Sequence, residues 1–303
     1  MHETEHPPTT RPTATPEVRM RGPVPVTIRL GLNGLSRVAP EAAGRLAFEL
    51  WRRPGPTRQV RASERAVHDA ARASFIEHAD HRVATYAWGD GSRPVLLVHG
   101  WGSRASRFAG LVAALLERGY SPVSYDAFGH GATGGAVATI LDHQAVIEAL
   151  AERHGPFEGV VAHSLGVPFA LYAVREGVAV GRVVAISGVS DFGYLVDGFC
   201  AKLGLRTSLS RRLRRRIERS YFDGDRGIWE RFSARRAAGC DLLVVHNTVD
   251  EVVDRGQADL LAAAYGERAT LMETTGLGHS RIVGDPEVIR AAVAFLATEA
   301  VAA

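Results

Sequence analysis

The feature that most restricts the fold of this chain is an alternation of sequence patterns that begins at residue 82. Short apolar runs, each as long as a strand, alternate with longer stretches in which apolar residues recur at helical spacing. This order is typical of β–α units whose strands pair in parallel. The expected strands are 82–88, 94–100, 121–126, 159–164, 182–187, 241–247 and 269–274. The expected helices are about 105–118, 138–153, 165–176, 255–265 and 285–299. The pattern therefore predicts an α/β fold with a mainly parallel central sheet flanked by helices.

One interval interrupts the alternation. Nearly fifty residues, about 192–240, separate the fifth expected strand from the sixth, which is too long for an ordinary connection. We predict a small helical lid insertion here. Its segment 208–222 holds six arginines within nine residues, and an apolar residue recurs at every fourth position, at Leu209, Leu213, Ile217 and Tyr221. This stripe favours a solvated lid helix whose arginine stems cover apolar surface, with contact to an acidic substrate, a partner or a membrane as the alternative.

The residues before the alternation form two further segments. Residues 1–26 are rich in proline and lack the charged-then-apolar order of a secretory signal, so we expect a disordered tail. Residues 27–80 are expected to be a helical extension of a domain over 81–303. Apolar residues over 27–52 recur at helical spacing, and Pro40 is expected to divide this stretch into two helices. Packing of these helices on the domain is favoured over contact with a membrane surface, which stays as the alternative.

The composition argues against several classes of partner. Of the 303 residues, 36 are Lys or Arg and 33 are Asp or Glu, and because both signs are interspersed, no nucleic-acid surface is expected. Lys202 is the only lysine, a skew toward arginine that indicates GC-rich coding and a bacterial source. Cys200 and Cys240 suggest neither a disulfide framework nor a metal pair, so the expected location is the reducing cytoplasm. A spanning helix is not expected, because no apolar stretch reaches about 18 residues.

A serine stands where the expected strand 159–164 turns into a helix, in the sequence AHSLG. This stretch resembles the GxSxG nucleophile elbow of the α/β-hydrolase superfamily, where a sharp turn exposes the serine hydroxyl above the sheet. Ala162 replaces the first glycine of the motif and keeps that position small. The resemblance implies an α/β-hydrolase fold over about 82–300, with Ser164 as the nucleophile.

A serine nucleophile also needs a base, a carboxylate that orients the base, and donors for the oxyanion. The resemblance supplies each group in the chain order of the superfamily. The segment LLVVHNTVDEVVD matches its acid loop and implies Asp250, and TTGLGHSRIV implies His279 as the base. The segment VLLVHGWGSRASRF resembles the HGxG oxyanion segment, which implies the backbone N–H groups of Trp101 and Leu165 as oxyanion donors.

Other side chains compete for these roles. Asp191 follows the strand after the nucleophile, a position that some members of the superfamily use for the acid, but the DEVV context favours Asp250. Glu251 and Asp254 are expected to face solvent or to cap the following helix. His163 alternates to the other face of its strand from the serine, so it is expected to pack and not to react.

No metal or nucleotide cofactor is expected. His99, Asp126 and His130 stand in segments where the superfamily uses such residues to hold loops. The histidines at 99, 130, 246 and 279 lie on separate loops without zinc-type spacing, and the chain contains no phosphate-binding glycine loop.

The expected activity is that of a carboxylesterase-like serine hydrolase. The resemblance implies an acyl-enzyme on Ser164 and a small-molecule ester substrate with an apolar acyl or alcohol group. Hydrolysis of thioesters, amides or carbon–carbon bonds, or acyl transfer, remains open with the same residues. A non-catalytic relative that binds a small ligand in the same pocket, and a membrane-associated or partner-docking protein built on the N-terminal helices, are alternatives of other classes.

Overall fold

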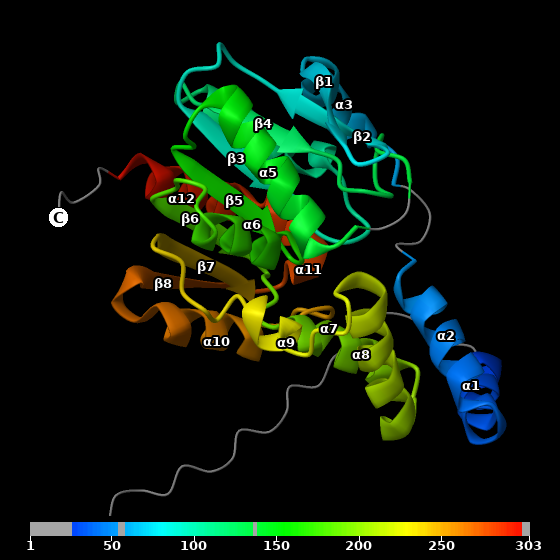
Figure 1. Cartoon of the computed structure of the whole chain (residues 1–303). Coiled ribbons are helices and arrows are strands. Elements are labelled where there is room, and N and C mark those ends of the chain that lie inside the picture. Colours follow the sequence, from blue (N-terminus) through cyan, green and yellow to red (C-terminus); the bar gives the residue numbers. More distant parts are fainter. Residues whose placement is uncertain (1–25, 54–57, 136–137, 299–303) are drawn as a thin grey trace, which may run out of the picture.

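The computed structural model describes residues 26–53, 58–135 and 138–298 (Figure 1). The tail expected over 1–26 lies outside these residues except for Val26, with which the first helix begins. Among the described residues, no helix combines the length and the apolar character that a membrane crossing requires.

In the described part of the chain, eight strands form one sheet in the spatial order β1-β2-β4-β3-β5-β6-β7-β8. Their bounds are β1 Arg72–His78, β2 His81–Ala87, β3 Pro94–Val98, β4 Ser121–Tyr125, β5 Gly159–His163, β6 Arg182–Ile186, β7 Asp241–Asn247 and β8 Ala269–Thr274. β2 pairs antiparallel with both β1 and β4, and every other neighbouring pair is parallel. The sheet is therefore mainly parallel, and the carboxyl ends of β3 to β8 meet at one edge.

Strand β1 is the one strand that the sequence pattern did not predict. It lies inside 27–80, the segment expected to be a helical extension. Of its seven residues only Ile76 is buried, so β1 lacks the apolar alternation by which a strand is recognised. It forms one edge of the sheet. Hydrogen bonding to β2 holds it there, although it has almost no buried apolar face.

Helices cover both faces of the sheet (Figure 1). One layer contains α4 (Ala109–Leu116) and α12 (Pro286–Ala297), and the other contains α5 (Ile140–His154), α6 (Gly166–Arg175) and α10 (Gly256–Tyr265). Successive residues of β3 alternate between the two cores, with Val95 and Leu97 facing the first layer and Leu96 and Val98 the second. All four are fully buried, as expected for a parallel strand covered on both sides.

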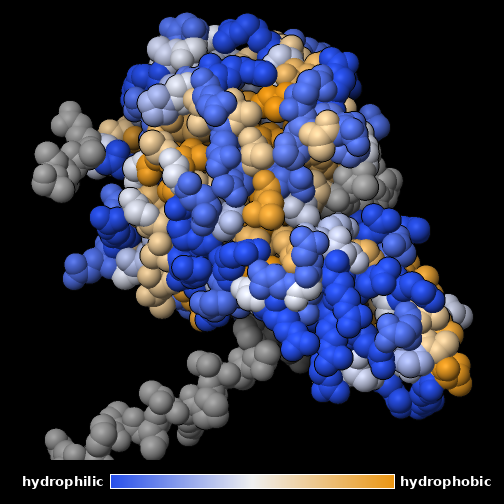
Figure 2. Space-filling model, viewed as in Figure 1, coloured by the Kyte–Doolittle hydropathy of each residue, from blue (hydrophilic) through white to orange (hydrophobic). Residues whose placement is uncertain are grey.

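Three helices lie between β6 and β7, where the sequence predicts the lid insertion. They are α7 (Phe192–Lys202), α8 (Thr207–Tyr221) and α9 (Ile228–Arg231). The apolar stripe of α8 is buried at Leu209, Leu213 and Ile217. Most arginines of this helix are exposed or half-buried, and Figure 2 shows a largely hydrophilic surface over it.

The two N-terminal helices pack against this insertion and not against the sheet. They are α1 (Val26–Val38) and α2 (Pro40–Trp51), divided at Pro40. Ala43 and Ala47 of α2 share an apolar cluster with Leu209, and Glu41 pairs with Arg212 of α8. The connection beyond α2 leads to the short helix α3 (Ala62–Asp69), which packs on α4.

Candidate active site

Ser164 occupies the sharp turn between β5 and α6. Its φ angle is +56°, in the left-handed region that a side chain other than glycine adopts only under constraint. Two hydrogen bonds hold this turn: the Ser164 N–H donates to the Ile186 carbonyl at 2.9 Å, and the Val167 N–H donates to the Ser164 carbonyl at 3.1 Å. A Cβ at Gly166 would stand 2.3 Å from the Val98 carbonyl oxygen, so the motif needs glycine there for the close approach of helix and strand.

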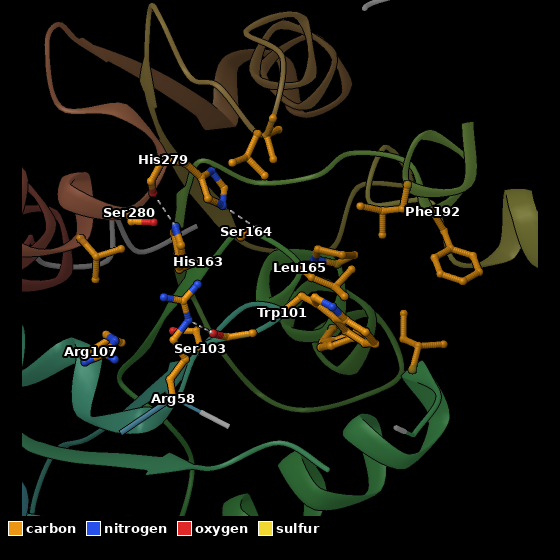
Figure 3. A pocket seen from close by; sticks show the side chains of 18 of the residues that line it. Arg58, Trp101, Ser103, Arg107, His163, Ser164, Leu165, Phe192, His279 and Ser280 are labelled. Atoms are coloured by element: carbon orange, nitrogen blue, oxygen red, sulfur yellow. Dashed lines mark hydrogen bonds between the residues drawn. The ribbon is translucent and has the colours of Figure 1, made fainter. Parts of the chain in front are cut away.

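The structure brings together the three side chains that the sequence resemblance selected. His279 lies in the short helix α11 (Gly278–Arg281), which follows β8. Its Nε2 lies 3.0 Å from Ser164 Oγ. Its Nδ1 lies 2.9 Å from Asp250 Oδ2 (Figure 3 shows the serine contact). Because a carboxylate can only accept, we assign the ring proton to Nδ1, which leaves Nε2 to accept the serine proton.

The Asp250 carboxylate is fully buried, and the groups around it stabilise its negative charge. Its Oδ1 accepts hydrogen bonds from the N–H groups of Val252 and Val253 at 2.8 and 2.9 Å. Burial acts to raise the pKa of Asp250, but the hydrogen bond and charge of His279 and these two N–H donors outweigh it and lower the pKa to about 2. The carboxylate is therefore ionised throughout the neutral range.

The two expected oxyanion donors come from two different segments beside Ser164. Leu165 directly precedes α6, and Trp101 follows β3. Within the described part of the chain, neither backbone N–H has a hydrogen-bond partner. A Cβ at Gly100 would stand 2.7 Å from the Cβ of Ser164, which places this loop directly against the serine.

Two buried histidines fix the loop that carries Trp101. Nε2 of His130 accepts from the Gly102 N–H at 2.9 Å, and Nε2 of His99 accepts from the Ala127 N–H at 2.9 Å. Burial lowers the pKa of His99 to about 4, which keeps this acceptor nitrogen free of a proton. These contacts agree with the loop-holding roles expected for both residues.

Asp126 joins the same loops from the end of β4. Its Oδ1 accepts from the Ala105 N–H at 2.8 Å, and its Oδ2 accepts from the Ala132 N–H at 2.7 Å. The Tyr86 hydroxyl and Arg104 also donate to Oδ2. The Asp126 carboxylate therefore holds the backbone of these loops in place, and it does not contact Ser164.

The competing acids are held by other groups. Asp191 caps α7 by accepting from the Gly193 N–H at 2.7 Å, and it pairs with Arg235 at 3.2 Å. Asp254 accepts from the N–H of Gly256 at the start of α10. Glu251 accepts from the backbone N–H of His279 at 3.3 Å, so it holds the turn that carries the histidine.

His163 contacts the site, which strand alternation did not predict. Its Nε2–H donates to the His279 carbonyl at 3.0 Å, and the two rings lie 4.8 Å apart. Burial lowers the pKa of His163 to about 3, so the ring is neutral. Alternation along β5 predicts only which face of the strand a side chain occupies. It does not predict that the backbone of α11, more than a hundred residues later in the chain, packs on this ring.

Ser164 opens into a cavity of about 710 Å³. Its apolar part is built largely by rings of α6 and the insertion, including Phe169, Phe192, Phe199, Tyr221, Phe222 and Phe232. Trp51 and Arg58, from the N-terminal segment, also line it. No local sequence signal marks either of these two, because their position depends on how distant segments pack. Within the described residues, no group of His, Cys, Asp and Glu side chains is arranged to hold a metal ion.

Comparisons with known proteins agree on the fold. Residues 95–292 match the sequence profile described as the alpha/beta hydrolase family. An esterase from Pyrococcus furiosus superposes with a TM-score of 0.59 at 18% identity, over 80% of this chain and 95% of the esterase. A monoacylglycerol lipase from Paleococcus ferrophilus gives a TM-score of 0.54 at 22% identity, over 71% and 98% of the two chains.

A mouse protein, alpha/beta hydrolase domain-containing protein 10, gives a TM-score of 0.58 at 16% identity, over 73% of this chain and 95% of that chain. No curated protein sequence matches the chain. At these identities, the structural likeness establishes the fold alone.

Proposed function

This chain belongs to the alpha/beta hydrolase family, and on that premise we propose that it is a serine hydrolase that cleaves a carboxylic ester. The observation that carries the proposal is the hydrogen-bonded chain from Ser164 through His279 to Asp250, with links of 3.0 and 2.9 Å. A nucleophile, a base and an orienting acid in this relation generate an alkoxide-like oxygen at neutral pH.

The first half of the reaction acylates the serine. His279 Nε2 takes the proton of Ser164 Oγ as the oxygen attacks the ester carbonyl carbon, and Asp250 stabilises the imidazolium that forms. The backbone N–H groups of Trp101 and Leu165 donate to the carbonyl oxygen as it becomes negative. Collapse of this intermediate breaks the carbon–oxygen bond, and the imidazolium returns the proton to the leaving alcohol.

The second half restores the enzyme. A water molecule takes the place of the alcohol, His279 removes its proton, and the hydroxide oxygen attacks the acyl carbon. The carboxylic acid leaves as Ser164 Oγ recovers its proton from His279. The same two backbone donors stabilise the second tetrahedral intermediate.

The lining of the cavity supports an apolar group on the substrate. Phenylalanine and tyrosine rings surround the part of the cavity next to the insertion, and about 710 Å³ is enough for a medium-length acyl or alcohol chain. We take the insertion as a lid on this basis, because α7 and α8 supply Phe192, Phe199 and Tyr221 to the wall.

Labelling with a fluorophosphonate probe tests the proposal. The wild-type protein and the exposed-serine control Ser220→Ala are expected to be labelled, and Ser164→Ala is expected not to be. Turnover of p-nitrophenyl esters of increasing chain length then measures the apolar part of the cavity. If the folded wild-type protein is neither labelled nor active, the protein is instead a ligand-binding relative without catalysis.

A further inference from the structure

The charge on the cavity wall is strongly unbalanced. The arginines that line the cavity are Arg52, Arg58, Arg61, Arg107 and Arg281. Among the described residues, Glu64 is the only acidic side chain on this wall. Arg61 and Arg107 both pair with Glu64, and Arg52, directly after α2, pairs with Glu49 of that helix. The wall therefore keeps an excess of positive charge next to the serine.

Arg58 and Arg281 account for much of this excess. Within 26–53, 58–135 and 138–298, neither forms an ion pair with a carboxylate, and each is instead held by backbone oxygens. Nε of Arg58 donates to the Gly102 carbonyl at 3.1 Å, one residue after the oxyanion donor Trp101. Nε and Nη2 of Arg281 donate to the carbonyls of Leu277 and Gly276 at 2.9 and 2.8 Å.

These backbone bonds orient each guanidinium without neutralising it. Among the described residues, both Nη groups of Arg58 and Nη1 of Arg281 have no hydrogen-bond acceptor and can donate to a ligand. Both arginines are exposed, and these bonds restrict part of the freedom that each side chain would otherwise lose on binding an oxyanion. The planar fork of a guanidinium fits a carboxylate or a phosphate.

Two of the wall arginines, Arg58 and Arg107, lie on the other side of the serine from the apolar ring of Phe192. Figure 3 shows Arg58, Ser103 and Arg107 on one side and Phe192 on the other, with Ser164 and Leu165 between them. The serine hydroxyl at 103 adds a further neutral donor to the cationic side. An ester bond placed at Ser164 therefore has one substituent directed to the rings and one directed to the arginines.

We propose that the substrate is an amphiphilic ester with an apolar chain on one side of the scissile bond and an oxyanion group, a carboxylate or a phosphate, on the other. The inference rests on the proposed serine hydrolase activity. It adds that Arg58 and Arg281 bind the oxyanion and so select the substrate, while the insertion binds the chain.

Matched pairs of neutral and anionic esters test this substrate class. Butyl octanoate is compared with the octanoyl ester of 3-hydroxypropanoate, and octyl pentanoate with monooctyl succinate, so that the anion stands on the alcohol side in one pair and on the acyl side in the other. The octanoyl ester of 2-hydroxyethyl phosphate adds the phosphate arm. The wild-type kcat/KM is expected to favour an anionic ester about tenfold or more, and the preference to shrink as salt rises from about 0.05 to 0.5 M.

Two variants locate the selectivity. Arg58→Gln and Arg281→Gln are each expected to lower the ratio of anionic to neutral kcat/KM by roughly tenfold, whereas Arg236→Gln, an exposed arginine outside the cavity wall, retains the wild-type ratio. The ratio is measured within each variant, so a general loss of activity cancels.

The outcomes separate this inference from the proposed function. Neutral esters that turn over as fast as every anionic partner, with labelling that depends on Ser164, overturn the anionic substrate and leave the serine hydrolase intact. Absence of both labelling and turnover removes the serine hydrolase itself. A preference for anions that survives both arginine substitutions overturns the assignment of Arg58 and Arg281.

Discussion

Asp250 and Asp191 are the same residue type at the ends of neighbouring parallel strands, and their surroundings separate them. The carboxylate of Asp250 is fully buried and lies 2.9 Å from His279 Nδ1. The carboxylate of Asp191 caps α7 and pairs with Arg235. The first can orient the base, and the second holds the start of the insertion.

Asp250→Asn is therefore expected to lower kcat by about 10³- to 10⁴-fold, because an amide NH₂ directed at Nδ1 favours the ring tautomer with its proton facing the serine. Asp191→Asn is the matched control, and its kcat is expected to stay within a few-fold of wild type. Initial rates on a p-nitrophenyl ester measure both. Comparable losses in the two variants would show that the geometric choice of the acid is wrong.

At the scale of residues, three motifs that resemble those of the α/β-hydrolase superfamily selected the side chains that the structure joins, with His279 hydrogen-bonded to Ser164 and to Asp250. Ser164, Asp250 and His279 each follow a strand, and the carboxyl ends of parallel strands meet at one edge. Arg58 and His163 owe their contacts with the site to segments more than forty residues away, Gly102 and His279 respectively. Neither contact has a local pattern in the sequence, so neither could be predicted from it.

At the scale of elements, the strands from β2 to β8 were predictable and β1 was not. The parallel strands agree with the expected ranges to within two residues at either end. Of these, β3, β5, β6 and β7 are almost wholly buried apolar runs, whereas β8 is mostly exposed or half-buried. Most residues of β1 are exposed, and its strand conformation depends on pairing with β2. The packing of α2 against α8 was also not predictable, since an apolar helix face does not specify the element that covers it.

The contact between α2 and the insertion links the N-terminal segment to the cavity. Phe48 of α2 lies 5.4 Å from the ring of Tyr221 and stacks on Trp51 at 6.3 Å. Trp51 in turn meets the ring of Phe192 edge to face at 6.0 Å, and both line the cavity. A change in α2 should therefore reach the apolar substrate site.

Phe48→Ala is expected to lower the free energy of unfolding by about 3 kcal/mol, since it removes a buried ring. It is also expected to raise KM for long-chain esters more than for short-chain ones, because Trp51 loses its support. Urea unfolding and the p-nitrophenyl series measure the two effects. Phe75→Ala on β1, where the side chain is 43% exposed, serves as the control and should cost about 1 kcal/mol or less. Equal effects of the two variants would place α2 outside the folded unit.

At the scale of the whole molecule, the fold carries several histidines in its interior without charge. Burial lowers the pKa of His99 to about 4, and that of His143 and His163 to about 3. His143 is buried on α5, where its Nδ1 and the Tyr125 hydroxyl are 2.9 Å apart and its ring stacks on Phe169, which lines the cavity. The loops and the turn of the site thus depend on imidazoles that must remain neutral.

This interior makes the stability of the protein fall in mild acid. In the unfolded chain a histidine titrates near 6.5, whereas these folded groups titrate near 3 to 4. Between these values the unfolded state binds protons that the folded state excludes, so stability is full above about pH 6.5 and declines as the pH falls toward 4. At pH 5 each histidine is expected to cost about 2 kcal/mol of unfolding free energy.

Urea unfolding at pH 7.5 and pH 5.0, followed by circular dichroism, measures the decline. His143→Gln removes one of the buried histidines. Between the two pH values, its free energy of unfolding is expected to fall by about 2 kcal/mol less than that of the wild type. This difference does not depend on how stable the variant is at pH 7.5. Gln144→Ala, at a half-buried position on the same helix, removes no titratable group, so it is the control and should keep the wild-type difference. Below pH 4, protonation of Asp250, whose folded pKa is about 2, removes a further contribution in the same direction. Unfolding midpoints that do not change between pH 7.5 and 5.0 would mean that these histidines already accept protons in the folded state, and the loop-holding hydrogen bonds through unprotonated nitrogens would have to be reassigned.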